Sequence, residues 1–362
     1  MKLLFLGDFF FDYPYLPKDF LEICSFVQQK NYRVIVNLET VWGTSGKPVR
    51  KRGVHLRSSR QLIEALKQLN VIAVCLANNH TLDFGPEPLE NLCQELTRAG
   101  ILYVGAGRNL EQALKPLALP ETSLLLQNFA WETEEAVSAT KTGAGVAPLR
   151  RDTVMAQSRK LRKKYPDHFI VNIYHWGFEY NLLPNPSDIH FAHQSIDAGA
   201  DMIIGHHPHV IQPYEKYKEK DIFYSLGNFY FASRRKNYNK HFPVPPCNAC
   251  DFGLGIVFDT VTKQAEGLVS VEYQKAADLS SVTPAAESAV VRDITSVDWK
   301  SKDYIKKVRE MSCNFTPVLT LNSFHNAGAL GWLHFKYKMA FLLKFLKKSR
   351  LGNVVFEWAK KL

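Results

Sequence analysis

The sequence predicts a protein of the α/β class, and three observations support this assignment. Short apolar runs bounded by turn-forming residues recur through the first part of the chain, a pattern that is typical of buried β-strands. Segments with apolar residues at helical spacing lie between these runs, and this alternation is typical of α/β folds. The chain has 362 residues, 46% hydrophobic and 22% charged, which is enough for one large domain with an extension.

The apolar runs predict eight strands followed by a hairpin. We expect strands at residues 2–7, 33–38, 71–77, 102–105, 123–129, 169–174, 202–205 and 222–226. The hairpin is expected at residues 253–260 and 267–274, at the edge of a sheet.

The helices between the strands have recognisable first and last residues. We expect helices over residues 62–69, 86–99 and 186–199. Pro86 and Pro186 fit the first turn of a helix, where the N–H that proline lacks has no intrahelical partner in any case. Gly100 and Gly199 fit the position after the last turn.

The composition changes after Gly227. Residues 233–251 are polar and contain prolines, so we expect a long surface loop there, and residues 276–297 have the small and polar side chains of a linker. We therefore divide the chain into a main domain at 1–262, a hairpin end and linker at 263–300, and a C-terminal extension at 301–362.

The positive charge of the chain lies in that extension. The net charge is +10 overall and +9 from residue 301 onward. Residues 331–350 are aromatic, basic and compatible with a helix, so a basic helical extension is expected. Such a segment binds anionic membrane surfaces, or it packs on the main domain with a solvated lysine face. No nucleic-acid-binding signature accompanies the charge, so nucleic acid is not an expected partner.

The sequence indicates a cytoplasmic protein, with peripheral attachment to the inner membrane as the alternative that the basic extension leaves open. No apolar run reaches the roughly 18 residues that span a bilayer. The apolar start ends at Asp8 without a cleavage site, so we interpret it as a first strand. Six cysteines are too sparse for a disulfide scaffold. Cys247 and Cys250 have the spacing of half a zinc site, but no second pair follows nearby, so an ordinary loop is expected.

Side chains that can bind metal follow the ends of several expected strands. Ligands of open α/β sheets gather beyond the carboxyl ends of the strands, and carboxylate, amide and imidazole groups suit Mn, Fe or Zn. The sequence therefore predicts a divalent-metal site at this edge. Its candidate ligands are Asp8, Glu39, Asn79, His80, His175 and the run His206-His207-Pro208-His209.

The motifs at these strand ends also resemble those of a known family. They are Leu6-Gly-Asp8, Asn37-Leu-Glu39, Asn78-Asn-His80, His175-Trp-Gly-Phe-Glu179, Gly205-His-His-Pro-His209 and Gly227-Asn-Phe229. The series covers about residues 1–260 and resembles that of the CapA family of poly-γ-glutamate capsule synthesis proteins, within the calcineurin-like metallophosphoesterase superfamily. The resemblance implies a four-layer αββα sandwich of the metallo-dependent phosphatase type, with two mixed sheets flanked by helices.

The resemblance also implies roles for individual residues. His80 corresponds to the catalytic histidine that faces the scissile group. Asp83 orients it, or is a simple turn residue. Spacing does not decide whether His206 or His207 is the ligand that acts with His209. The metal ligands implied are Asp8, Glu39, Asn79, His175, His206 or His207, and His209.

Three further residues are candidates for substrate binding. Asn228 and Glu179 are expected at the rim of the crevice. Arg57, with the basic run at residues 50–52, fits an anionic substrate group or a solvated charge run. One departure stands out: Asp8 is followed by Phe9 and Phe10, where the superfamily usually has Asp-x-His.

The expected function is that of a CapA-type, metallophosphoesterase-like hydrolase or transferase in capsule or surface-polymer synthesis. It would use water activated by one or two divalent ions (Mn, Fe or Zn) on an anionic polymer or a phosphoester. The alternative is a non-catalytic, metal-binding accessory subunit that docks a membrane-bound polymer synthase, or an anionic membrane surface, through its basic tail.

Overall fold

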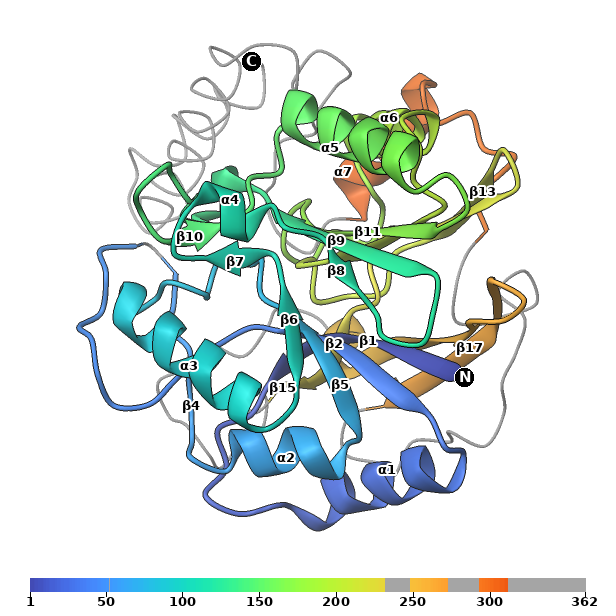
Figure 1. Ribbon diagram of the computed structural model, residues 1–362. Coiled ribbons are helices and arrows are strands. Elements are labelled where there is room, and N and C mark those ends of the chain that lie inside the picture. The colour runs from blue at the N-terminus through green and yellow to red at the C-terminus, as the bar shows by residue number, and fades with distance from the viewer. Residues whose placement is uncertain (52, 232–247, 273–292, 312–362) are drawn as a thin grey trace, which may run out of the picture.

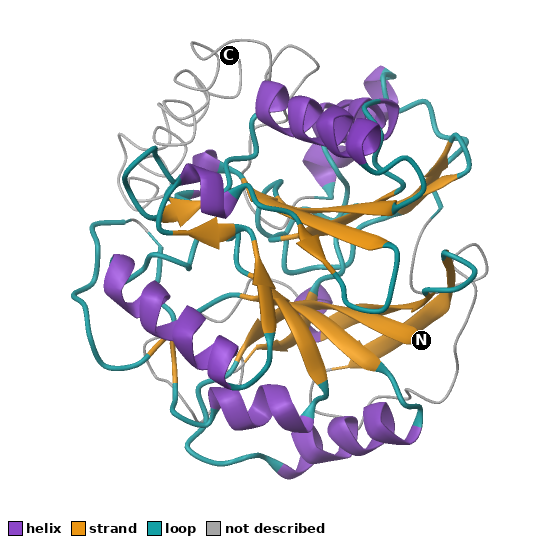
Figure 2. Cartoon of the chain, in the orientation of Figure 1, coloured by secondary structure: helices purple, strands orange, loops and turns teal. Residues whose placement is uncertain are grey.

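The computed structural model of the protein describes residues 1–51, 53–231, 248–272 and 293–311 (Figure 1). The parts of the chain that it describes form a sandwich of four layers, in which two sheets lie face to face and helices cover both outer faces (Figure 2). The four-layer αββα arrangement expected from the family resemblance is therefore confirmed.

The first sheet contains the N-terminal strand near its centre. Within the described residues its order is β17-β16-β1-β2-β5-β6, and β15 also pairs with β1. Strands β2 and β15 are parallel to β1, and β16 is antiparallel to it. The bounds are β1 Lys2–Phe10, β2 Arg33–Leu38, β5 Val71–Cys75, β6 Leu102–Val104, β15 Asn228–Phe231, β16 Phe252–Asp259 and β17 Gln264–Glu272.

The second sheet has the order β13-β14-β12-β11-β9-β8 in the same ranges. Its four inner strands are parallel, and β13 and β8 are antiparallel to their neighbours. The bounds are β8 Leu117–Ala118, β9 Leu124–Ala130, β11 Phe169–His175, β12 Met202–His206, β13 Tyr214–Tyr217 and β14 Lys220–Phe223. Two short pairs lie outside the sheets, β3 Val41–Trp42 with β4 Arg57–Ser58 and β7 Ala106–Gly107 with β10 Gly145–Val146.

Helices cover the two outer faces. Figure 1 shows α1, α2 and α3 beside the first sheet and α5, α6 and α7 beside the second. The bounds are α1 Lys18–Gln29, α2 Leu62–Gln68, α3 Pro86–Arg98, α4 Leu110–Ala113, α5 Arg151–Lys164, α6 Pro186–Asp197 and α7 Lys302–Glu310, with short 3-10 helices at Glu132–Glu134 and Asn248–Asp251. None of the described helices has the length and apolar character needed to cross a bilayer.

Residues 3–6 of strand β1 form a continuous apolar run because this part of the strand is buried on both faces. Leu3 and Phe5 lie in the core between the two sheets, whereas Leu4 and Leu6 lie in the core under the helices of the first sheet. Successive side chains of a strand point to opposite faces, so a segment of a strand that faces a core on both sides is apolar at successive positions.

The predicted strands and hairpin are largely confirmed. Helices α3 and α6 begin at Pro86 and Pro186 as expected, and β16 and β17 form the expected hairpin at a sheet edge. The strand expected at 222–226 ends at Phe223, because the chain then crosses to the other sheet, where β15 pairs with β1. The domain boundaries stay predictions. The tail segment 331–350, most of the loop 233–251 and most of the linker 276–297 lie outside the described residues.

Candidate metal centre

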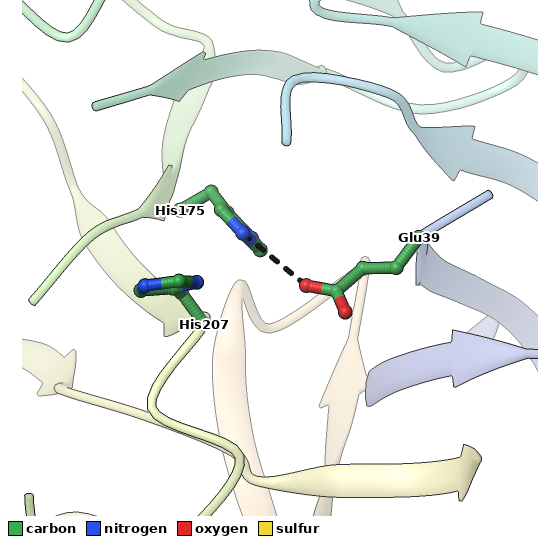
Figure 3. A group of neighbouring side chains, drawn as sticks. All are labelled: Glu39, His175 and His207. Atoms are coloured by element: carbon green, nitrogen blue, oxygen red, sulfur yellow. Dashed lines mark ion pairs between the residues drawn. The ribbon is translucent and has the colours of Figure 1, made fainter. Parts of the chain in front are cut away.

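The carboxyl ends of strands from both sheets bring the predicted ligands together. Asp8 lies in β1 and Glu39 directly follows β2, while His175 ends β11 and His206 ends β12. Residues His175 and His206 are direct partners in the pairing of β11 with β12. Figure 3 shows Glu39 facing His175 and His207 from the opposite side of the site.

The first group of potential metal ligands contains Glu39, His175 and His207. One ligand atom from each of these buried residues lies within 4.8 Å of the others. Glu39 Oε1 is 3.2 Å from His175 Nε2, and the rings of His175 and His207 are 4.7 Å apart between centroids. Carboxylate oxygen with two imidazole nitrogens is a donor set suited to Zn, Mn or Fe.

The second group contains Asp8, Glu39 and His209, and its ligand atoms also lie within 4.8 Å of one another. Asp8 Oδ2 is 3.3 Å from His209 Nδ1, and Glu39 Oε2 is 3.8 Å from His209 Nε2. Glu39 belongs to both groups, with one oxygen facing His175 and the other facing His209. The geometry therefore offers two neighbouring cation positions that share one carboxylate.

Polar side chains around the two groups hold their members in place. Asn37 Nδ2 donates a 2.8 Å hydrogen bond to Asp8 Oδ1 and lies 3.3 Å from His175 Nδ1. Asn228 Oδ1 is 2.9 Å from His209 Nδ1. Asn228 starts β15 and pairs directly with Asp8, so the crossing between the sheets places this amide at the site.

The pKa values of the two buried carboxylates are shifted in opposite directions. Burial alone would raise the pKa of Asp8, but the neighbouring imidazole groups of His206 and His209 outweigh it and hold that pKa well below its usual range. Burial and the neighbouring charge of Asp8 raise the pKa of Glu39 well above its ordinary value. A cation between the groups would favour the ionised form of Glu39, because an opposite charge nearby stabilises a carboxylate.

The pKa values of the buried histidines are also shifted in opposite directions. Burial and the nearby His207 lower the pKa of His175 well below its ordinary value, and burial lowers the pKa of His207 to about 4. Burial would also lower the pKa of His209, but Glu39 and Asp8 outweigh it and raise that pKa to about 10. His175 and His207 are therefore neutral and able to ligate at pH 7, whereas a cation must displace a proton from His209.

Unpartnered buried atoms at the centre fit a bound cation. Among the described residues, Glu39 Oε2, His206 Nδ1 and both ring nitrogens of His207 are buried without a hydrogen-bond partner. Buried polar atoms normally have partners, and leaving one without costs about 1–3 kcal/mol. Glu39 and His207 are members of the ligand groups, and a cation bound there would give such atoms a partner.

The Asn79-His80 turn lies beside these groups. Asn79 Oδ1 is 3.0 Å from His175 Nε2, so the side chain joins the predicted ligands. His80 Nδ1 is 2.8 Å from Asp83 Oδ2, as expected for an aspartate that orients the ring. Burial and the neighbouring Lys51 lower the pKa of His80 to about 4, so its imidazole is neutral.

Lys51 lies inside this arrangement rather than in a solvated charge run. Its ammonium group forms an ion pair with Asp83 Oδ1 and is 3.1 Å from His80 Nδ1, and its side chain is only 5% exposed. The backbone N–H of Leu56 also donates to Asp83, at 2.7 Å. The loop after Glu39 therefore packs onto the His80 turn and supplies a buried positive charge.

The other predicted residues, His206, Glu179 and Arg57, have different surroundings. His206 Nδ1 is 3.2 Å from Asp8 Oδ1, and His206 is not a member of either ligand group, whereas His207 and His209 are. Glu179 is half-buried and close enough to influence the pKa values of Glu39 and His209. The guanidinium of Arg57 stacks on Phe84 and binds the backbone carbonyls of Gly43 and Ser45.

Two residues at the centre, Asn37 and Glu134, were not among the sequence-predicted site residues, and Lys51 was considered only as part of the basic run at residues 50–52. Asn37 lies inside the Asn-Leu-Glu motif, but an amide within a strand gave no reason to prefer it. Lys51 belongs to a basic run, a pattern that usually marks solvated surface. Glu134, whose Oε2 is 3.7 Å from His207 Nε2, follows the strand expected at 123–129, and the rule on strand ends could have singled it out.

Comparison with known proteins agrees with this picture. The model of the family described as "Bacterial capsule synthesis protein PGA_cap" matches residues 2–233. The "PGA biosynthesis protein CapA" of Bacillus subtilis is 34% identical over 181 residues, 49% of this chain and 47% of that protein. A "Probable polyglutamine synthesis accessory protein" of Mycobacterium tuberculosis is 33% identical over 205 residues, 54% of each chain. The chain thus spans about half the length of the curated relatives it matches.

Solved structures resemble the chain more distantly. A hypothetical protein from Thermus thermophilus aligns with a TM-score of 0.41 at 14% identity, over 76% of this chain and 95% of that one. The sulfate thiohydrolase SoxB of Thermus thermophilus aligns with a TM-score of 0.42 at 11% identity, over 86% of this chain and 60% of that one. The description of the fold above therefore rests on this chain's own strands and helices.

Proposed function

The chain belongs to the bacterial capsule synthesis protein family PGA_cap, within the metallophosphoesterase-like superfamily, and from this premise we propose that it is a divalent-metal-dependent hydrolase or transferase in the synthesis of a poly-γ-glutamate-like surface polymer. The observation that carries the proposal is Glu39, whose two carboxylate oxygens face two groups of buried ligands. Two adjacent cation positions with a shared carboxylate are typical of sites that transfer phosphoryl or acyl groups.

The ligands of one ion would be Glu39, His175 and His207, and those of the other would be Asp8, Glu39 and His209. Asn79 would add an amide oxygen beside His175. When bound, Mn, Fe or Zn would lower the pKa of water toward neutrality and polarise a phosphoryl or acyl oxygen.

The chain's own residues would then orient the substrate and move protons. His80 is neutral and its Nδ1 is held by Asp83, so its Nε2 would accept a proton from the attacking group and would then return it to the leaving oxygen or nitrogen of the scissile bond. Lys51 keeps a positive charge beside this pair. Glu179, Asn228 and Arg57 remain our candidates for contacts with the anionic polymer or phosphoester substrate.

Turnover of model substrates tests the catalytic proposal. Phosphomonoesters, phosphodiesters and γ-glutamyl amides would be incubated with the protein and Mn²⁺. We expect a turnover that His80→Ala lowers by about 100-fold or more, because a positioned general acid or base contributes 10²–10⁴-fold. Metal affinity should change little in this variant. A turnover that His80→Ala and His175→Ala leave unchanged would contradict the assignment.

A second candidate function is supported by the relative from Mycobacterium tuberculosis, which is named a probable accessory protein. In this reading the metal centre is structural, and the chain assists a membrane-bound polymer synthase at an anionic membrane surface. The basic residues proposed to dock it lie at 301–362, mostly outside the described residues. Sedimentation with anionic liposomes that is lost on deleting residues 331–362 would support this function. Equal sedimentation of both forms would contradict it.

A further inference from the structure

The carboxylate of Glu134 belongs to neither ligand group, but it lies at the same edge of the second sheet. Strand β9 is parallel to β11, and its last residue, Ala130, pairs with His175. The next backbone N–H, that of Trp131, donates a 3.0 Å hydrogen bond to the carbonyl of His175. The short 3-10 helix Glu132–Glu134 directly follows this hydrogen bond, so Glu134 lies beside the candidate metal centre.

Glu134 meets His207 on this side of the site. Its Oε2 lies 3.7 Å from His207 Nε2, and both side chains are largely shielded from solvent, at 9% and 1% exposure. Figure 3 shows one ring nitrogen of His207 on the side of Glu39 and the other on the far side of the ring. A carboxylate at Nε2 leaves Nδ1 as the nitrogen for the group with Glu39 and His175.

The backbone of His207 also indicates a position that is fixed by its surroundings. Its φ of 96° lies in the left-handed region, which a residue with a Cβ rarely adopts. The N–H of His207 donates a 3.2 Å hydrogen bond to Asp8 Oδ2, so the strained conformation is held by a member of the second ligand group. Strain of this kind persists where the surrounding structure enforces it, and functional sites are common among such places.

We propose that Glu134 is a positioning residue of the metal centre, which accepts the Nε2–H of His207 and so presents Nδ1 to a cation held with Glu39 and His175. Histidines that bind metals usually donate their other ring N–H to a carboxylate or carbonyl, which fixes the tautomer and the ring orientation. The 3.7 Å separation between these two atoms is longer than a hydrogen bond, so the proposal requires the two side chains to approach each other when a cation is bound. This inference rests on the metal centre of the proposed function.

Mn²⁺ binding to the full-length protein tests this role. Glu134→Ala removes the carboxylate, and Glu134→Gln keeps an oxygen that can accept the N–H. Glu132→Ala is the matched control, because Glu132 lies on the same 3-10 helix and pairs with Arg150 at the surface, with 38% of its side chain exposed. Isothermal titration calorimetry with Mn²⁺ alone would measure the Kd of each site, and Co²⁺ absorption spectra would report the ligand geometry.

We expect Glu134→Ala to weaken one of the two cation sites by about 10–100-fold, as loss of such a partner typically does. The other site should keep its Kd. Glu134→Gln should recover most of the affinity, and Glu132→Ala should match the wild type. An unchanged Kd and Co²⁺ spectrum in Glu134→Ala would overturn the inference and leave the metal centre standing. A wild-type protein that binds no Mn²⁺ would overturn the metal centre itself.

Discussion

Replacing Lys51 with methionine tests the buried charge beside His80. The side chain of Lys51 is 5% exposed and that of Asp83 is 0% exposed, so solvent does little to screen the pair. Removing one partner of a buried ion pair typically destabilises a protein by 3–5 kcal/mol. Asp83 keeps hydrogen bonds from the backbone of Leu56 and from His80. We therefore expect Lys51→Met to lower the free energy of unfolding by about 3 kcal/mol, at the lower end of that range.

A double-mutant cycle measures the pair itself. Asp83→Asn should also cost about 3 kcal/mol, because it leaves the ammonium group buried without a carboxylate. The double variant should cost about 4 kcal/mol instead of the sum, which gives a coupling energy of about 2 kcal/mol.

Urea unfolding of the full chain, followed by circular dichroism, provides these values. Lys18→Met is the control, because Lys18 is 93% exposed and its contact with Glu22 is 3.8 Å long. Its effect should stay within about 0.5 kcal/mol. Losses that add within about 0.5 kcal/mol in the Lys51 and Asp83 cycle would refute the buried pair.

Two further predictions concern the packing of strand β12 and the charge of a buried carboxylate in helix α6. A Cβ on Gly205 would lie 1.9 Å from the carbonyl oxygen of Tyr224, so Gly205→Ala should destabilise the fold by about 3 kcal/mol or more. Gly53→Ala is the control in the same urea assay. Its Cβ would have only Lys51 nearby, at 3.9 Å, so the free energy of unfolding should hardly change. Burial raises the pKa of Asp188 to about 6, above its unfolded value, so the folded state binds the proton more tightly and stability falls as pH rises from about 4 to about 6, by about 3 kcal/mol. Asp188→Asn should remove that part of the pH dependence, and a pH profile identical to the wild type would contradict the assignment.

The parts of this fold that depend on local sequence patterns could be predicted from the sequence. Buried strands such as β1 and β5 contain continuous apolar runs, and prolines mark the first turns of α3 and α6. The meeting of Asp8, Glu39, His175 and His209 also followed from the sequence, since parallel strands place their carboxyl ends together.

The parts that were missed depend on contacts between distant segments. Nothing local shows that the chain leaves the second sheet after Phe223 and that Asn228 then pairs with Asp8. Lys51 has the sequence context of a surface residue, and only the packing of its loop onto the His80 turn buries it. Glu134 follows an expected strand, but Glu132 and Glu135 lie beside it, and only the folded structure shows which of the three contacts His207.

The metal content of purified protein tests the central claim most directly. Wild-type protein and the variants Glu39→Ala, His175→Ala and His209→Ala would be loaded with Mn²⁺ or Zn²⁺, desalted and measured by elemental analysis. Because Glu39 belongs to both ligand groups, Glu39→Ala should lose all bound metal. Each histidine variant should lose the ion of its own group and keep the other. A wild-type protein without metal, or a Glu39→Ala variant that retains as much as the wild type, would contradict the account.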